Sequence, residues 1–129
     1  MAGPIVFISH HRIKQGELES LTALVPEIWS SLEKNKPRTL LNLAFVNEDG
    51  TEVAFMHALA DIEAMQSHWQ GADERAQQAY EYIEPIGFEI YGDAGDQIVE
   101  GMRSEAAAAG ATLTLVPRYM AGFLRLAPA

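Results

Sequence analysis

Four histidines and the absence of cysteine define the chemistry open to this chain of 129 residues. An imidazole can accept a proton near neutral pH, so each histidine is a candidate general base. Without cysteine, the chain can form no disulfide, thiolate zinc site or cysteine nucleophile. Proton transfer by histidine is therefore the first chemistry to consider.

His68 and His57 are the two candidate catalytic residues. His68 falls beside Met65 and Trp69 on a helical stripe, at the edge of the side expected to be buried. His57 alternates with Phe55 along a strand, and a buried histidine there needs a partner or a cavity. If that face turns toward the helices, both histidines line one pocket; otherwise His57 bonds across an interface. For His68 the alternative is simple packing at a helix edge.

Aromatic and arginine side chains provide candidate ligand-binding residues. Trp69 and Tyr80 are about three helical turns apart and fall roughly on one side. Aromatic residues at this spacing usually belong to a core, yet a planar aromatic ligand also needs such walls. Arg118 could close the pocket or bind an anionic group, or be a solvated edge charge. With Phe55, these three are the predicted ligand contacts.

We expect neither a metal nor a cofactor. His10 and His11 are adjacent on a strand, so their side chains point to opposite faces. One of them could converge with His57, but no acidic ligand lies near on those strands. The chain also lacks a G-x-G-x-x-G motif, which fits a protein that needs no flavin or nicotinamide.

A net charge of -9 and the lack of long apolar runs exclude several classes of partner. No basic stripe suits nucleic acid, and anionic membranes repel this charge. No run approaches the ~20 apolar residues that cross a bilayer, and the first residues lack a secretory pattern. We expect a cytoplasmic protein that binds a small apolar or aromatic ligand, or another protein.

Hydrophobic periodicity predicts the element order β-α-β-β-α-β-α-β. Asp61 is the expected N-cap of the second helix, and Gly110 the expected end of the third. Proline should kink or divide the first helix at Pro26, stop the second at Pro85 and interrupt the last strand near Pro117. The expected strands are 5–13, 40–46, 51–60, 86–91 and 112–126, and the expected helices are 17–36, 61–84 and 98–109.

The first six elements have the split βαβ order of a ferredoxin-like α+β fold. We expect one domain over residues 1–129, with a core at 4–92 and a helix–strand extension at 93–129. A two-layer domain leaves one sheet face without helices. Because the first and third strands carry apolar residues on both faces, a second copy of the chain is the expected cover, which gives a homodimer.

The segments IVFISHHRIKQGELESL and FVNEDGTEVAFMHALADIEAMQSHWQG, with Asp61-Ile62-Glu63-Ala64 and His68 in the second, carry a family resemblance. Over residues 4–92 the chain resembles the antibiotic-biosynthesis-monooxygenase-like proteins of the dimeric α+β barrel superfamily. The resemblance implies an antiparallel sheet with helices on one face, paired into a dimeric barrel. It also implies that His68 lines a pocket between sheet and helices.

As activity, the resemblance implies a cofactor-independent monooxygenase of phenolic or quinol-like aromatics. His68 or His57 would remove a phenol proton, with Tyr80 or Arg118 as the oxyanion donor. The anion would react with dioxygen, and loss of water would leave a quinone. Haem degradation is disfavoured, because Ser9 replaces the first-strand asparagine of that branch and no histidine follows Trp69 at its spacing.

Two other functions stay open. One is a non-catalytic domain that binds a small ligand or only dimerises, with structural histidines. The other is an isomerase or cyclase that uses one histidine as general base. An open cavity of ~300 Å³ or more would favour an enzyme or a binding protein, whereas a filled core would favour a structural role.

Overall fold

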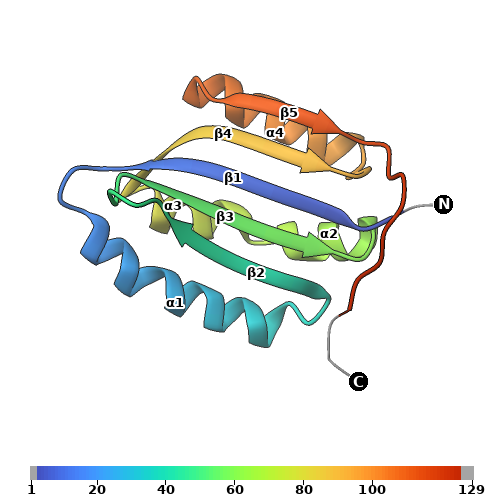
Figure 1. The fold of residues 1–129 in the computed structure, drawn as a ribbon, viewed down its shortest axis with the longest axis horizontal. Coiled ribbons are helices and arrows are strands. Elements are labelled where there is room, and N and C mark those ends of the chain that lie inside the picture. The colour runs from blue at the N-terminus through green and yellow to red at the C-terminus, as the bar shows by residue number, and fades with distance from the viewer. Residues whose placement is uncertain (1–2, 126–129) are drawn as a thin grey trace.

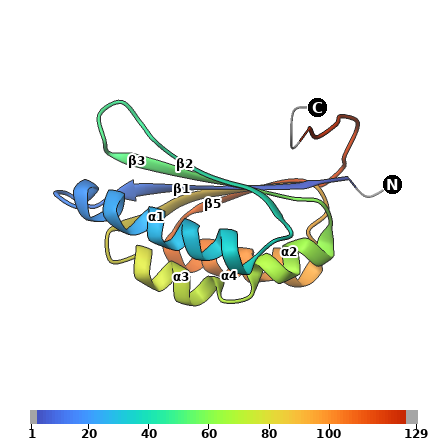
Figure 2. The ribbon, with the colours of Figure 1, turned by 90° about the horizontal axis from the view of Figure 1, so that it is seen from below.

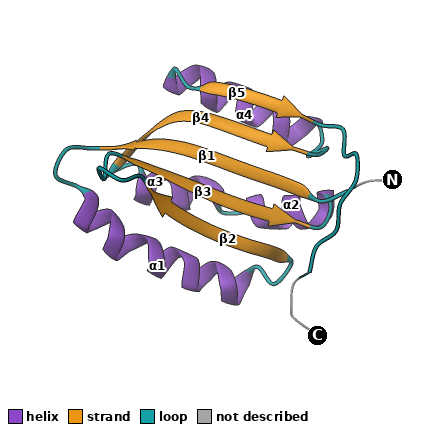
Figure 3. Cartoon of the chain, in the orientation of Figure 1, coloured by secondary structure: helices purple, strands orange, loops and turns teal. Residues whose placement is uncertain are grey.

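The computed structural model describes residues 3–125 of the chain, apart from the side chain of Asp73. Its elements follow the predicted order, with one predicted helix divided in two (Figure 3). They are β1 (Ile5–Ile13), α1 (Leu18–Asn35), β2 (Thr39–Val46), β3 (Glu52–Leu59), α2 (Ile62–Trp69), α3 (Ala72–Ala79), β4 (Ile83–Tyr91), α4 (Asp96–Ala109) and β5 (Thr112–Val116).

The five strands form one sheet in the order β2-β3-β1-β4-β5 (Figure 1). The pairs β2–β3, β3–β1 and β1–β4 are antiparallel. The pair β4–β5 is parallel, because α4 carries the chain back between them. All helices lie on one face of this sheet (Figure 2). The predicted ferredoxin-like α+β fold with an added helix and strand is confirmed.

Strand register decides which side chains face the helices. Along β1, Phe7, Ser9 and His11 are buried and alternate with the more exposed residues of the open face. The antiparallel register with β3 places His57 beside Phe7 and Phe55 beside Ser9. His57 therefore points toward the helices. Of the two faces considered for it, this is the one expected to line a pocket with His68.

Two apolar clusters flank the buried polar side chains of Ser9, His11 and His57. One surrounds Leu59 and Met65, and the other surrounds Leu21 and Ile83. Each fully buried aliphatic side chain contributes about 1.5–3 kcal/mol relative to leaving it exposed. This stabilisation offsets the cost of burying four polar residues, which are Ser9, His11, His57 and His68.

The prediction of one continuous helix over residues 61–84 was wrong. It breaks between α2 and α3, where Gln70 is extended and Gly71 takes a positive φ of 80° that favours glycine. Helix α3 then ends at Ala79, and Pro85 lies within β4 rather than beyond a helix. The proline is tolerated there because it pairs with β1 next to a register shift. Asp61 caps α2 as expected, accepting from the Ala64 N–H at 2.8 Å.

Two further expectations about proline are met only in part. Helix α1 is not divided at Pro26 and continues as one helix, with the buried Leu21 and Ile28 on either side of the proline. Strand β5 ends at Val116, so residues 117–125, which include Arg118, have no strand structure. Pro117 ends the strand, because it lacks the N–H that would continue the ladder. Gly110 ends α4 in the left-handed conformation, as expected.

Candidate functional site

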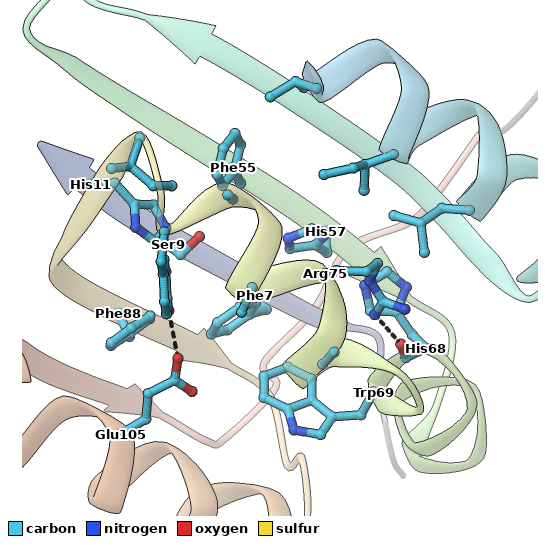
Figure 4. A pocket seen from close by; sticks show the side chains of 18 of the residues that line it. Phe7, Ser9, His11, Phe55, His57, His68, Trp69, Arg75, Phe88 and Glu105 are labelled. Atoms are coloured by element: carbon cyan, nitrogen blue, oxygen red, sulfur yellow. Dashed lines mark hydrogen bonds between the residues drawn. The ribbon is translucent and has the colours of Figure 1, made fainter. Parts of the chain in front are cut away.

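A cavity of about 130 Å³ lies between the sheet and the helices (Figure 4). Five of the six predicted site residues line it, and they are Phe55, His57, His68, Trp69 and Tyr80. The fold brings them together from β3, α2 and the end of α3. Arg118 does not line the cavity, since it is exposed beyond β5. Its ligand contact stays a prediction.

The volume of the cavity limits the size of the ligand. It falls below the ~300 Å³ stated above as favouring an enzyme or a binding protein, although it is not a filled core. An engineered cavity of about 150 Å³ lined by aliphatic and aromatic side chains is nevertheless enough to bind benzene. The cavity therefore matches one aromatic ring, and its walls include Phe7, Trp29, Phe55, Trp69 and Phe88.

His57 is held in one orientation by Asn42 of β2. Its Nδ1 atom hydrogen-bonds to Asn42 Oδ1, which the β2–β3 register places directly opposite. A carbonyl oxygen only accepts, so Nδ1 carries the proton and Nε2 keeps the lone pair. Burial, followed by the nearby His68, lowers the pKa of His57 to about 3. The imidazole is thus neutral at physiological pH, with Nε2 able to accept a proton.

His68 lies against His57, with 4.9 Å between the ring centroids. Its Nδ1 atom is 2.8 Å from Thr39 Oγ1, and burial, then Arg75, lowers its pKa to about 4. Two imidazolium ions at this separation would repel each other strongly. The pair can therefore take up one proton far more easily than two.

Arg75 provides a positive charge at the cavity. Its guanidinium donates to the His68 carbonyl oxygen at 2.6 Å and to the Gln70 carbonyl oxygen at 3.1 Å, and it lines the cavity (Figure 4). Desolvation lowers its pKa, although a guanidinium stays charged. Helical periodicity could not predict this contact, because the chain leaves the helix at Gln70 and Gly71, between His68 and Arg75.

A second polar group lies at the opposite end of the cavity (Figure 4). The Tyr80 hydroxyl donates to Glu105 Oε1 at 2.6 Å, and the Tyr80 ring lies 6.0 Å from that of His11. Burial, with a smaller effect of His10, lowers the pKa of His11 to about 4. Glu105 belongs to α4, so the C-terminal extension contributes to the cavity.

Three buried nitrogens near the cavity lack a hydrogen-bond partner among the described parts of the chain. They are His11 Nδ1, Trp29 Nε1 and Asn42 Nδ2. Buried polar atoms are normally paired, so a ligand or water in the cavity is the expected partner. In this same part of the chain, no three acidic or histidine side chains converge to hold a metal.

Comparisons with known proteins bear on the fold. No protein-family model matches the chain, and no curated protein does either. Among solved structures, MupZ from Pseudomonas fluorescens is similar with a TM-score of 0.72 at 15% identity, covering 98% of this chain and 99% of MupZ. A putative antibiotic biosynthesis monooxygenase from Caulobacter crescentus CB15 gives 0.62 at 12% identity, covering 74% and 92%. The chain has their fold.

The solved structures differ in how much of this chain they match. A further putative antibiotic biosynthesis monooxygenase, from Bacteriodes thetaiotaomicron VPI-5482, gives a TM-score of 0.54 at 19% identity, over 63% of this chain and 80% of its own. The likeness to MupZ spans nearly the whole chain and so includes the C-terminal helix and strand. At these identities the comparisons establish fold alone. Within residues 3–125, no helix has the length and apolar character to cross a membrane.

Proposed function

We propose that the chain is a cofactor-independent monooxygenase of small, single-ring phenolic compounds. The observation that carries this proposal is the hydrogen bond from His57 Nδ1 to Asn42 Oδ1, which leaves Nε2 as a proton acceptor on a residue that lines an aromatic cavity. The fold shared with putative antibiotic biosynthesis monooxygenases supports the same reaction class.

In this mechanism His57 removes the phenol proton while Arg75 stabilises the phenolate. The free imidazole is a weak base because burial lowers its pKa to about 3. A phenol with a pKa of about 10 would not lose its proton to such a base unaided. The guanidinium lowers the phenol pKa, and the phenolate in turn raises that of His57, so the two ions form as a pair. Proton transfer and charge stabilisation are thus coupled.

The phenolate then reacts with dioxygen at a ring carbon. One carbon–oxygen bond forms, the oxygen–oxygen bond breaks, and the ring carbon loses its hydrogen. The ring keeps one oxygen as a quinone carbonyl, and the other leaves as water with two protons. The substrate supplies the electrons, so no separate reductant enters. In this proposal, protonated His57 returns its proton to the departing oxygen.

Oxygen consumption with a panel of phenols and hydroquinones tests this function. We expect His57→Ala to lower the rate by at least about 100-fold, the usual contribution of a general base, and His68→Ala to lower it less. His10→Ala, on the open face of the same sheet, is the matched control and should keep the wild-type rate. Wild-type rates in both cavity variants would contradict the mechanism. Turnover without oxygen consumption would instead indicate an isomerase or cyclase that uses the same histidine.

We also propose that the open sheet face pairs with a second copy of the chain. This face carries Leu41, Leu43 and Phe45 of β2, which are 36%, 42% and 55% exposed. No helix covers it (Figure 2). Exposed apolar patches of this kind mark interaction surfaces, and a twofold pairing buries the same patch on both copies.

Sedimentation or light scattering can test the pairing. We expect a dimer for the wild type and a monomer for Leu43→Lys or Phe45→Lys, because a buried unpaired charge opposes association. Val46→Lys is the matched control, since Val46 is 45% exposed on the same strand but pairs with Val53 on the helix-covered side. A wild-type monomer at high micromolar concentration, or a monomer caused equally by Val46→Lys, would argue against this interface.

A further inference from the structure

We propose that His11, together with the Tyr80–Glu105 pair, is a second polar anchor that binds a hydroxyl group at the end of the ligand ring remote from His57. The inference rests on the proposed function, which places a ring in this cavity. It adds that the preferred ligand carries two polar substituents at opposite ends of one ring.

The first observation is the state of His11. It is 3% exposed and lines the cavity, yet none of the side chains and backbone groups that the structure describes is a hydrogen-bond partner of its Nδ1 atom. A buried nitrogen without a partner is unfavourable, and nearly all such groups in native proteins are paired. The neighbouring rings of Phe55 and Phe88 offer no hydrogen-bonding atom, and the hydroxyl of the neighbouring Tyr80 donates to Glu105. A ligand hydroxyl is therefore a suitable partner for the His11 nitrogen.

The second observation is the charge distribution along the cavity. Arg75 lies at the His57 end and Glu105 at the His11 end (Figure 4). An oxyanion or carbonyl oxygen is favoured beside the guanidinium, whereas a hydrogen-bond donor is favoured toward the carboxylate. A ligand with an ionising hydroxyl at one end and a neutral hydroxyl at the other matches both.

The spacing of the two ends fits a single ring. The register places His11 opposite Val53, four residues before His57 on β3, which corresponds to ~13 Å between backbone positions. By register Phe55 lies midway between the two histidines, with 5.2 Å between its ring centroid and that of His11. Phe7 lies directly opposite His57, with 5.6 Å between their ring centroids. One aromatic ring and a hydrogen bond of ~2.8 Å at each end span most of this distance.

Anaerobic calorimetric titration with phenol and with hydroquinone (1,4-dihydroxybenzene) tests the second anchor. We expect the wild type to bind hydroquinone about tenfold more tightly, the factor that corresponds to one net hydrogen bond. Hydroquinone has two equivalent hydroxyl groups and can bind in two equivalent orientations, so a twofold preference would arise without any second anchor. In His11→Phe, which keeps a ring without a nitrogen, the preference should fall to about twofold while phenol binds as before.

Two further variants keep the test decisive. Glu105→Gln removes the charge and should lower the preference about threefold, even if His11→Phe does not fold. His10→Phe is the matched control, because the same substitution lies on the opposite face of β1, and it should keep the tenfold preference.

The outcomes separate this inference from the function on which it rests. A wild-type preference of twofold or less, or a tenfold preference that persists in His11→Phe and Glu105→Gln, would overturn the second anchor. If His57→Ala still abolishes oxygen consumption in that case, the monooxygenase proposal survives. Failure of both probes to bind at millimolar concentration would overturn the two proposals together.

Discussion

Acidification from pH 7.5 to pH 5.5 is expected to lower the free energy of unfolding by about 4 kcal/mol. The cause is the burial of His11, His57 and His68, whose pKa values fall from 6.5 to about 4, 3 and 4. Between pH 6.5 and pH 4 the unfolded chain binds protons at these residues and the folded chain does not. Stability is therefore complete above pH 6.5 and is lost as the pH falls.

The size of this effect follows from the shifts. At pH 5.5 each buried histidine costs about 1.3 kcal/mol more than at pH 7.5, and the sum is a large part of the 5–15 kcal/mol of a typical domain. The carboxylate of Glu89 does not interfere. The hydrogen bonds that it accepts from Tyr91 and, second, from His10 lower its pKa from 4.5. Its contribution to the free energy of unfolding is therefore lost only below the range from pH 5.5 to pH 7.5.

Urea unfolding at pH 7.5, 6.5 and 5.5, followed by circular dichroism, measures the effect. The variant His11→Phe removes one of the three groups, and the difference in stability between pH 7.5 and 5.5 should fall by about one third. An equal pH dependence in this variant, or no loss of wild-type stability at pH 5.5, would contradict the assignment of neutral buried histidines.

The face occupied by His57 illustrates what the sequence alone could determine. Alternation along β3 grouped Phe55 and His57 correctly, because the period of a strand is two. It did not say which face the helices cover, since β1 and β3 are apolar on both faces. That choice depends on the handedness of the connections between strands, which apolar alternation does not record.

The site residues absent from the sequence analysis differ in how much signal they carried. The observed hairpin pairs Asn47 with Glu52 and Val46 with Val53, which places Asn42 opposite His57. A turn at 47–50 would instead pair Val46 with Thr51, so the predicted turn gave a shifted register and missed the Asn42 contact. Arg75 was not predicted, because the break at Gln70 and Gly71 that folds α3 back toward His68 was not expected. Glu105 had no local signal, because only the return of α4 across the sheet brings it to Tyr80.

The prediction for the C-terminal segment failed for a related reason. Apolar residues at 119–124 suggested a continued strand, but strand structure needs a neighbouring strand with free backbone groups. Strand β5 is the last in the sheet order, and Pro117 removes the next donor. Met120 and Phe123 are 95% and 79% exposed, so this chain provides them with no apolar cover.

Replacement of Asn42 should have the largest effect on activity outside the base itself. In Asn42→Leu the amide oxygen is lost, so His57 Nδ1–H has no acceptor and the ring can rotate or take the other tautomer. Loss of the residue that fixes a catalytic tautomer can lower kcat by as much as about 10⁴-fold in a serine protease. We expect a decrease of about 10²–10³-fold here, with KM changed little, in oxygen-consumption assays with the best phenol.

The variant Asn42→Asp separates orientation from mere packing. Its carboxylate still accepts from Nδ1, so His57 keeps its tautomer, but the negative charge stabilises the imidazolium and raises the pKa of His57. The acid limb of the kcat/KM profile should therefore move to higher pH than in the wild type, whose free imidazole has a pKa of about 3. Because Asn42→Leu is similar in size and uncharged, it should show the lower rate without that shift. Equal kcat values in the wild type and Asn42→Leu, with an unmoved acid limb in Asn42→Asp, would remove His57 as the base.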